Sequence, residues 1–199
     1  NTAVGDNAGG ALTTGGNNVA IGSGALLVAT TAADNTAIGT LALTANSSGT
    51  DNTAVGYAAG DAVTTGSDNT LVGDNAGGAI TTGGSNVAIG SAALLAATTA
   101  ADNTAIGTAA LTANTSGTDN VAVGYASLDA NTTGSDNTAI GDNALGANTT
   151  AANNTAVGSS ALLVNTTGTD NVAVGAGALD ATGAGTDGSY NVAIGNDAL

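Results

Sequence analysis

Residues 35–56 read NTAIGTLALTANSSGTDNTAVG, a stretch that begins and ends on nearly the same five letters. The second pentapeptide starts seventeen residues after the first. The same unit starts at Asn1 and restarts every seventeen residues as far as Asn171, and one more copy starts twenty residues later at Asn191. A fixed period of this length is the sequence signature of a stacked repeat architecture.

We number the unit from its asparagine, which is position 1. Position 4 is always Val or Ile, and position 5 is always Gly. Position 3 is Ala except at Leu71, and position 8 is Ala except at Ser127. Position 9 is Leu in most units and Gly in three, positions 13 and 14 are mostly Thr or Ser, and position 17 is usually Asp or Asn.

Positions 2 to 4 alternate a β-branched residue with Ala, which predicts a short strand, and a second apolar stretch over positions 8 to 12 predicts another. Gly at position 5 and the Thr-Gly-x-Asp cluster near the end of the unit predict the two reversals. Gly, Asn and Thr recur in every window and disfavour a helix. We therefore predict an all-β fold, a parallel β-solenoid (β-roll) of about twelve 17-residue coils with two short strands per coil, stacked about 4.8 Å apart.

A longer period of four coils is superimposed on the 17-residue repeat. The letters VGDNAGGA occur at Val4 and at Val72, and AVGYA places Tyr57 and Tyr125 sixty-eight residues apart. Duplication of a four-coil block explains this rhythm; alternatively, the two tyrosines are lateral contacts on one face, about 19 Å apart along the rod. We predict one β-solenoid repeat array over 1–199, with four-coil super-repeats 1–68, 69–136 and 137–199 and an insertion within 183–190.

Stacked asparagines at position 1 are expected to form a structural ladder, because each side-chain amide can hydrogen-bond to the asparagine above and below. The ladder comprises Asn18, Asn35, Asn52, Asn69, Asn86, Asn103, Asn120, Asn137, Asn154 and Asn171.

Aspartates at position 17 are expected to form an acidic ridge of Asp34, Asp51, Asp68, Asp102, Asp119, Asp136 and Asp170. Carboxylates about 5 Å apart repel one another, and bound Ca²⁺ would relieve the repulsion. The EF-hand loop and the glycine-rich calcium nonapeptide are both absent from the sequence, which favours a solvated ridge that caps turns and keeps rods from aggregating side by side.

The composition excludes several classes of function. The formal net charge is −15, with no Lys or Arg, which argues against nucleic acid and anionic membranes as partners. No apolar run is long enough for membrane insertion. The chain lacks His, Cys, Lys, Arg and Glu, so the usual bases and nucleophiles are missing and we predict neither an enzyme nor a cofactor. The letters GAGTDG at 183–188 match a dinucleotide-binding pattern, but no helix is expected to follow, so we interpret them as a loop.

Two further patterns have weak functional interpretations. The Thr columns at positions 13 and 14 resemble those of ice-binding solenoids, but adjacent strand residues face opposite ways, whereas such an ice face needs alternate positions. Asparagines at position 12 head N-x-Ser/Thr glycosylation sequons, namely Asn46, Asn114, Asn131, Asn148 and Asn165.

The alternation within positions 2 to 4 leaves two arrangements open. If the Ala of position 3 faces the inside of a thin roll, the Val/Ile column is exposed and needs a partner chain. If Val/Ile faces inside together with Leu of position 9, a monomeric rod is feasible. Strand edges at the ends of a solenoid favour assembly as well.

The pentapeptides NTAVG, NVAIG and NTAIG, with Ala-Leu a few residues on, resemble the head repeats of YadA-like trimeric autotransporter adhesins. They resemble equally the NTAVGYxAL repeats of phage tail fibres and large bacterial surface proteins. The resemblance implies a left-handed parallel β-roll on a cell surface or virion, often three chains around one axis. The period is longer than that of the adhesin head, the 199 residues hold no Lys or Arg, and we recognise in them no stretch that resembles the stalk or membrane anchor of that family.

From these observations we expect a structural extracellular fibre or cell-surface adhesin segment. It would be a stiff rod that self-associates into trimers or filaments and presents weak contacts many times, to a host surface or a glycan. The alternatives are a phage-like tail-fibre shaft and an ice-binding solenoid.

Overall fold

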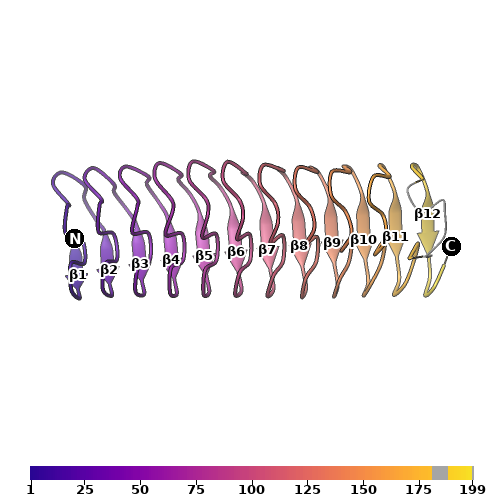
Figure 1. Cartoon of the computed structure of the whole chain (residues 1–199), viewed down its shortest axis with the longest axis horizontal. Coiled ribbons are helices and arrows are strands. Elements are labelled where there is room, and N and C mark those ends of the chain that lie inside the picture. Colours follow the sequence, from indigo (N-terminus) through magenta and orange to yellow (C-terminus); the bar gives the residue numbers. More distant parts are fainter. Residues whose placement is uncertain (181–187, 199) are drawn as a thin grey trace.

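The computed structural model describes residues 1–180 and 188–198. Each coil contributes one three-residue strand at positions 2 to 4, and the strands pair in chain order as one parallel twelve-stranded sheet along a rod (Figure 1). The strands are β1 Thr2–Val4, β2 Val19–Ile21, β3 Thr36–Ile38, β4 Thr53–Val55, β5 Thr70–Val72, β6 Val87–Ile89, β7 Thr104–Ile106, β8 Val121–Val123, β9 Thr138–Ile140, β10 Thr155–Val157, β11 Val172–Val174 and β12 Val192–Ile194. The predicted all-β parallel solenoid is confirmed.

Every strand pairs with its neighbour in the same register, so equivalent positions stack. Ala37 lies opposite Ala54, for example, and Ala173 lies opposite Ala193 although that step is twenty residues long. The extra residues therefore leave the register of the last strand unchanged. Residues 183–187 of the predicted insertion lie outside the described residues.

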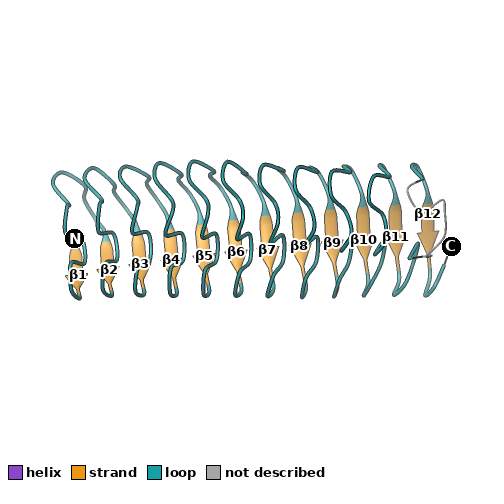
Figure 2. Ribbon diagram, viewed as in Figure 1, coloured by secondary structure: helices purple, strands orange, loops and turns teal. Residues whose placement is uncertain are grey.

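The prediction of a second strand in each coil is wrong. In the described residues, positions 8 to 12 form successive tight turns, and only positions 2 to 4 are extended (Figure 2). In the first coil, Gly10 N–H donates to the Asn7 carbonyl and Leu12 N–H to the Gly9 carbonyl. Positions 7 and 9 both adopt positive φ angles, which interrupts an extended backbone.

Leucine at position 9 has a left-handed backbone conformation in eight coils, with φ between 49° and 53°. This conformation costs roughly 1–2 kcal/mol for a residue with a Cβ. From the second to the tenth coil, every leucine at position 9 is fully buried. Burying such a side chain gains about 1.5–3 kcal/mol. Apolar burial therefore offsets the backbone strain.

The core is a thin layer of small residues beneath the sheet. Alanines at positions 3 and 8, leucines at position 9 and asparagines at position 1 are almost all fully buried from the second coil onward. Small side chains let the strand and the turn segment approach closely, which is the physical reason for the Ala columns.

Glycine at position 5 permits the close stacking of coils. Gly39 has a φ angle of 139°, and a Cβ at this position would lie 2.2 Å from the carbonyl oxygen of Gly56 in the next coil. A side chain there is excluded both by the φ angle and by the neighbouring backbone.

Candidate interaction surface

The outward side of the sheet consists of the side chains at positions 2 and 4, which we call the strand face. The Ala of position 3 points into the core, so its two neighbours point outward. Ile38 and Ile106 are each 37% exposed, whereas Ala37 and Ala105 are fully buried. The structure thus corresponds to the first of the two arrangements, with the Val/Ile column outside.

The strand face is long, mostly apolar and uncharged: position 4 is always Val or Ile, and position 2 is Thr in seven coils and Val in five. Eleven steps between the twelve strands, at about 4.8 Å each, give a length of about 53 Å, and three strand residues give a width of about 10 Å. Its area of about 500 Å² is at the size at which an exposed apolar patch on a monomer is often functional. Positions 1 to 5 carry no Asp in any coil, although the formal net charge of the chain is −15.

A ladder of buried asparagines lies along one edge of the strand face. The carboxamide of Asn52 donates to Asn35 Oδ1 at 3.1 Å and to the Gly66 carbonyl at 2.9 Å. The backbone N–H of Asn52 also donates to Asn35 Oδ1, at 3.0 Å. Such bonds link the position-1 asparagines from Asn18 to Asn171, so the ladder fixes the stacking of the strands that carry the face.

A second set of buried asparagines occupies position 12, and these are the asparagines that head the N-x-Ser/Thr glycosylation sequons. Asn114 accepts a hydrogen bond from the Gly117 N–H at 3.0 Å and donates to the Gly117 carbonyl at 3.0 Å. The five asparagines of these sequons are fully buried. The folded rod therefore presents none of them for modification. A glycine three residues later, in four of the five sequons, is the signal that could have indicated this turn-capping role.

Hydroxyl groups at position 13 donate hydrogen bonds to backbone carbonyls of the next coil. Thr64 Oγ1 donates to the Thr81 carbonyl at 3.0 Å, and Thr81 Oγ1 donates to the Thr98 carbonyl at 2.9 Å. The same bond recurs from Thr13 to Thr149. This column is a structural hydroxyl ladder.

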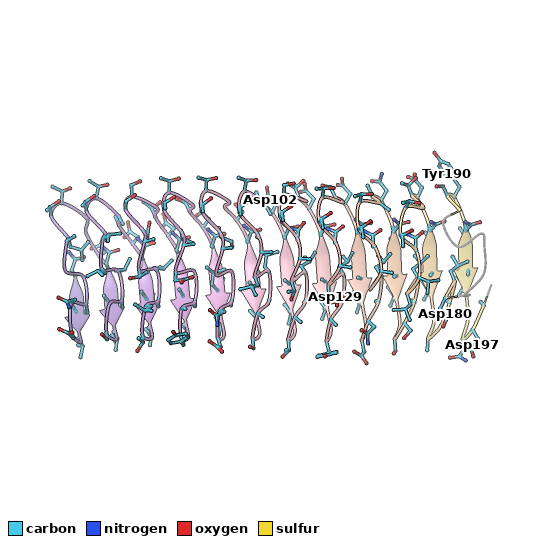
Figure 3. All side chains as sticks on the ribbon, viewed as in Figure 1. Asp102, Asp129, Asp180, Tyr190 and Asp197 are labelled. Carbon is cyan, nitrogen blue, oxygen red and sulfur yellow. The ribbon has the colours of Figure 1, made fainter. Side chains whose placement is uncertain are left out.

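The predicted acidic ridge lies at the corner that precedes each strand. Its aspartates have φ angles between 58° and 61° and are exposed or, at Asp170, half-buried. Figure 3 shows Asp102 at the same edge of the rod as Tyr190, which takes the equivalent place before β12. Within the described residues, no three Asp, Glu, His or Cys side chains gather closely enough to hold a metal ion. Binding of Ca²⁺ by the ridge stays a prediction.

Two of the three aspartates at position 10 have a different environment from the acidic ridge. Burial raises the pKa of the Asp61 and Asp129 carboxyls above 3.8, and backbone hydrogen bonds partly offset the effect. Position 10 of the next coil is Gly in both cases; a Cβ on Gly78 would lie 3.5 Å from Asp61 Oδ1. Neither residue is among the predicted sites; the signal in the sequence is their recurrence sixty-eight positions apart, the length of the four-coil super-repeat.

The two predicted contact tyrosines lie at equivalent places on the corner that follows the strand. Tyr57 is 56% exposed and Tyr125 is 61% exposed. Each accepts a backbone hydrogen bond from position 7 of the next coil, from Asn75 at 2.9 Å and from Asn143 at 3.0 Å. They therefore share one edge of the rod, four coils apart.

Over residues 1–180 and 188–198, there is no helical segment with the length and hydropathy needed to cross a bilayer. The surface feature that stands out is the strand face, because it combines length, apolar character and absence of charge. Comparison of the chain with protein-family models, curated proteins and solved structures gave no match.

Proposed function

We propose that the chain is a rod segment of an extracellular fibre or cell-surface adhesin, and that it assembles into trimers or filaments through the strand face. The observation that carries the proposal is the orientation of the strands. Alanine fills the interior, and the larger Val and Ile side chains lie outside in one continuous column. Burying this column against other chains removes apolar surface from water at a gain of about 25 cal/mol per Å².

Charge supports the same contact. Rods with a formal net charge of −15 repel one another, and this repulsion is weakest where carboxylates are lacking. Because the strand face carries no Asp, chains that meet there bring the fewest like charges together. Assembly would also repeat every surface site around the rod, which multiplies weak contacts with a partner.

The experiment is a mass measurement by light scattering on the intact chain and two variants. We expect the wild-type chain to form trimers or larger assemblies and Ile38→Asp/Ile106→Asp to be monomeric, because each added carboxylate would be buried without a partner. Leu27→Asp/Val28→Asp adds the same charge at exposed apolar residues outside the strand face and should leave the mass unchanged. A monomeric wild-type chain would contradict the proposal.

A phage-like tail-fibre shaft has the same physical requirements and differs in attachment. Ice binding is a second candidate because the outward position 2 is Thr in seven coils, which places hydroxyls at alternate positions beside the Val/Ile column. Thermal hysteresis by the wild-type chain, lost in Ile38→Asp/Ile106→Asp, would favour ice as the occupant of the strand face.

A further inference from the structure

Assembly through the strand face leaves the axial register of neighbouring chains nearly undetermined. Position 4 alternates only between Val and Ile, and position 2 only between Thr and Val. A slip of one coil therefore exchanges side chains that differ by a methylene or are almost isosteric. One methylene is worth about 0.8 kcal/mol when buried.

The corner at position 6 differs strongly from coil to coil. Its residues read Asp, Ser, Thr, Tyr over the first four coils and repeat this order over the next four; they are Asp6, Ser23, Thr40, Tyr57, Asp74, Ser91, Thr108 and Tyr125. Position 6 lies two residues after the outward Val or Ile, so these eight residues form a ridge that borders the strand face from β1 to β8.

From this juxtaposition we infer that Tyr57 and Tyr125 fix the axial register between copies of this chain that meet at the strand face. The inference rests on the proposed function. The partner that occupies the strand face is a second copy of the chain. The area supports a contact wider than the strand face, because about 500 Å² falls short of the roughly 800 Å² per partner of a stable interface. The exposed tyrosines on the bordering ridge supply large side chains of the kind that dominate interface energies.

Desolvation of an aspartate on the same ridge opposes a slip. A one-coil slip brings Tyr57 of one chain to the height of Asp74 or Thr40 of its parallel neighbour. The Asp74 carboxylate accepts from Asn75 Nδ2 at 3.0 Å and has no basic residue anywhere in the chain to pair with. Covering it with an aromatic ring removes water without compensation, and this cost disfavours the wrong register. A slip of four coils restores Tyr57 opposite Tyr125 but loses a third of the overlap.

The test measures register along the rod, where a slip changes distances directly. Because the chain has no Cys, Thr31→Cys and Thr133→Cys each give one labelling site, exposed and six coils apart. Chains with a nitroxide on the first site are mixed with chains that carry a gadolinium chelate on the second. In the unslipped register the two labels lie about 29 Å apart along the rod, and each slipped coil changes this axial component by about 5 Å. Pulsed electron resonance measures the distance between the labels, which changes with the axial component.

We expect one narrow distance distribution for chains with native tyrosines and several distances, in steps of about 5 Å, for Tyr57→Ala/Tyr125→Ala. Tyr190→Ala is the matched control, because Tyr190 is 80% exposed but lies at the opposite corner, and it should leave a single distance. An unchanged distribution in the double variant, or several registers in the native chain, overturns the inference while the proposed function stands. A monomeric mass for the same samples overturns both.

Discussion

Leu71 lies directly over Gly77: a Cβ on Gly77 would come within 2.7 Å of Leu71 Cδ2. A Cβ on Gly60, in the preceding coil, would come within 2.6 Å of Leu71 Cδ1. Position 3 is Ala in every other coil, and Leu71 is found where two successive coils have Gly instead of Leu at position 9. The same two coils have Val63 and Ile80 at position 12, so Leu71, Val63 and Ile80 together replace the volume of the two missing leucines.

Replacing Leu71 by Ala, the residue of every other coil, should therefore destabilise the protein. Leu71 is fully buried, and removing such a side chain costs about 2–5 kcal/mol because the surrounding structure cannot close the cavity. Urea unfolding followed by circular dichroism measures the loss. A neutral or stabilising effect of Leu71→Ala would contradict this explanation, because replacement by the residue found in every other coil is neutral or favourable where no neighbouring residue compensates.

A compensated variant distinguishes lost volume from a general intolerance of change. Leu71→Ala/Gly77→Leu/Ile80→Ala gives the fifth coil the residue set of the sixth, which is Ala88, Leu94 and Ala97. We expect it to regain much of the stability that Leu71→Ala loses. A triple variant as unstable as the single one would show that the coils are not interchangeable in this way.

Asn148 and Ala151 depart from the pairing of Asn at position 12 with Gly at position 15. Asn148 donates to the Ala151 carbonyl at 3.1 Å, but Asn148 Oδ1 is the one buried side-chain polar atom in the described residues without a partner. Two coils earlier, the Gly117 N–H donates to Asn114 Oδ1 at 3.0 Å, and a Cβ on Gly117 would lie 2.6 Å from that oxygen. The methyl group of Ala151 thus occupies the place that the oxygen needs to reach the N–H.

Ala151→Gly should stabilise the rod by roughly 1 kcal/mol, because satisfying a buried acceptor gains about 1–3 kcal/mol and the flexibility of Gly costs about 0.5–1 kcal/mol. Melting temperatures check this. The control is Ala100→Gly, at the same position of the sixth coil, where position 12 is Ala97 and offers no acceptor. That variant should be destabilised, and equal effects in both would refute the explanation.

The period, the glycine column and the parallel stacking followed from the sequence because each depends on one residue type at a fixed spacing. The second strand did not. An apolar stretch over positions 8 to 12 fits a strand as well as a run of turns, and Leu rarely adopts positive φ. The signal that distinguishes them is substitution across coils: Gly replaces Leu at Gly9, Gly60 and Gly77, and Asn appears at position 7, both of which tolerate this conformation.

The orientation of the strand face also needed the structure. Alternation separates Ala20 from Val19 and Ile21 but does not say which side is inside. Hydrophobicity alone would place Ile21 in the core. The thinness of the roll decides otherwise, since only Ala at position 3 lets the Leu of position 9 lie beneath the sheet.

The raised pKa values of Asp61 and Asp129 predict a dependence of stability on pH. The folded state binds these protons more tightly than the unfolded chain, so their unfavourable contribution at neutral pH is relieved as pH falls through the raised pKa toward 3.8. Asp61→Asn/Asp129→Asn should therefore melt higher than wild type at pH 7 and lose this advantage below about pH 3.8. Both carboxylates keep contact with water, so each gain stays below about 1 kcal/mol.

Removing any two carboxylates also reduces repulsion in a chain without basic residues. The matched control is Asp102→Asn/Asp119→Asn, which changes the net charge equally on the exposed ridge. Thermal melts between pH 3 and pH 8 compare the two variants. A gain of the same size and pH range in both would assign the effect to net charge and not to burial of Asp61 and Asp129.

Gly107→Ala should be among the most damaging single substitutions in the rod. Gly107 has a φ angle of 135°, and a Cβ there would lie 2.3 Å from the Gly124 carbonyl oxygen in the next coil. Strain and clash act together at a site stacked on both sides, so we expect a loss of at least about 3 kcal/mol in the free energy of unfolding. Gly16→Ala is the control, because a Cβ on Gly16 meets nothing within 4 Å and no positive φ angle is required. That substitution should change the free energy of unfolding by less than about 1 kcal/mol. Comparable losses in both variants, measured by urea unfolding, would mean that position 5 is not where the backbones of successive coils come into contact.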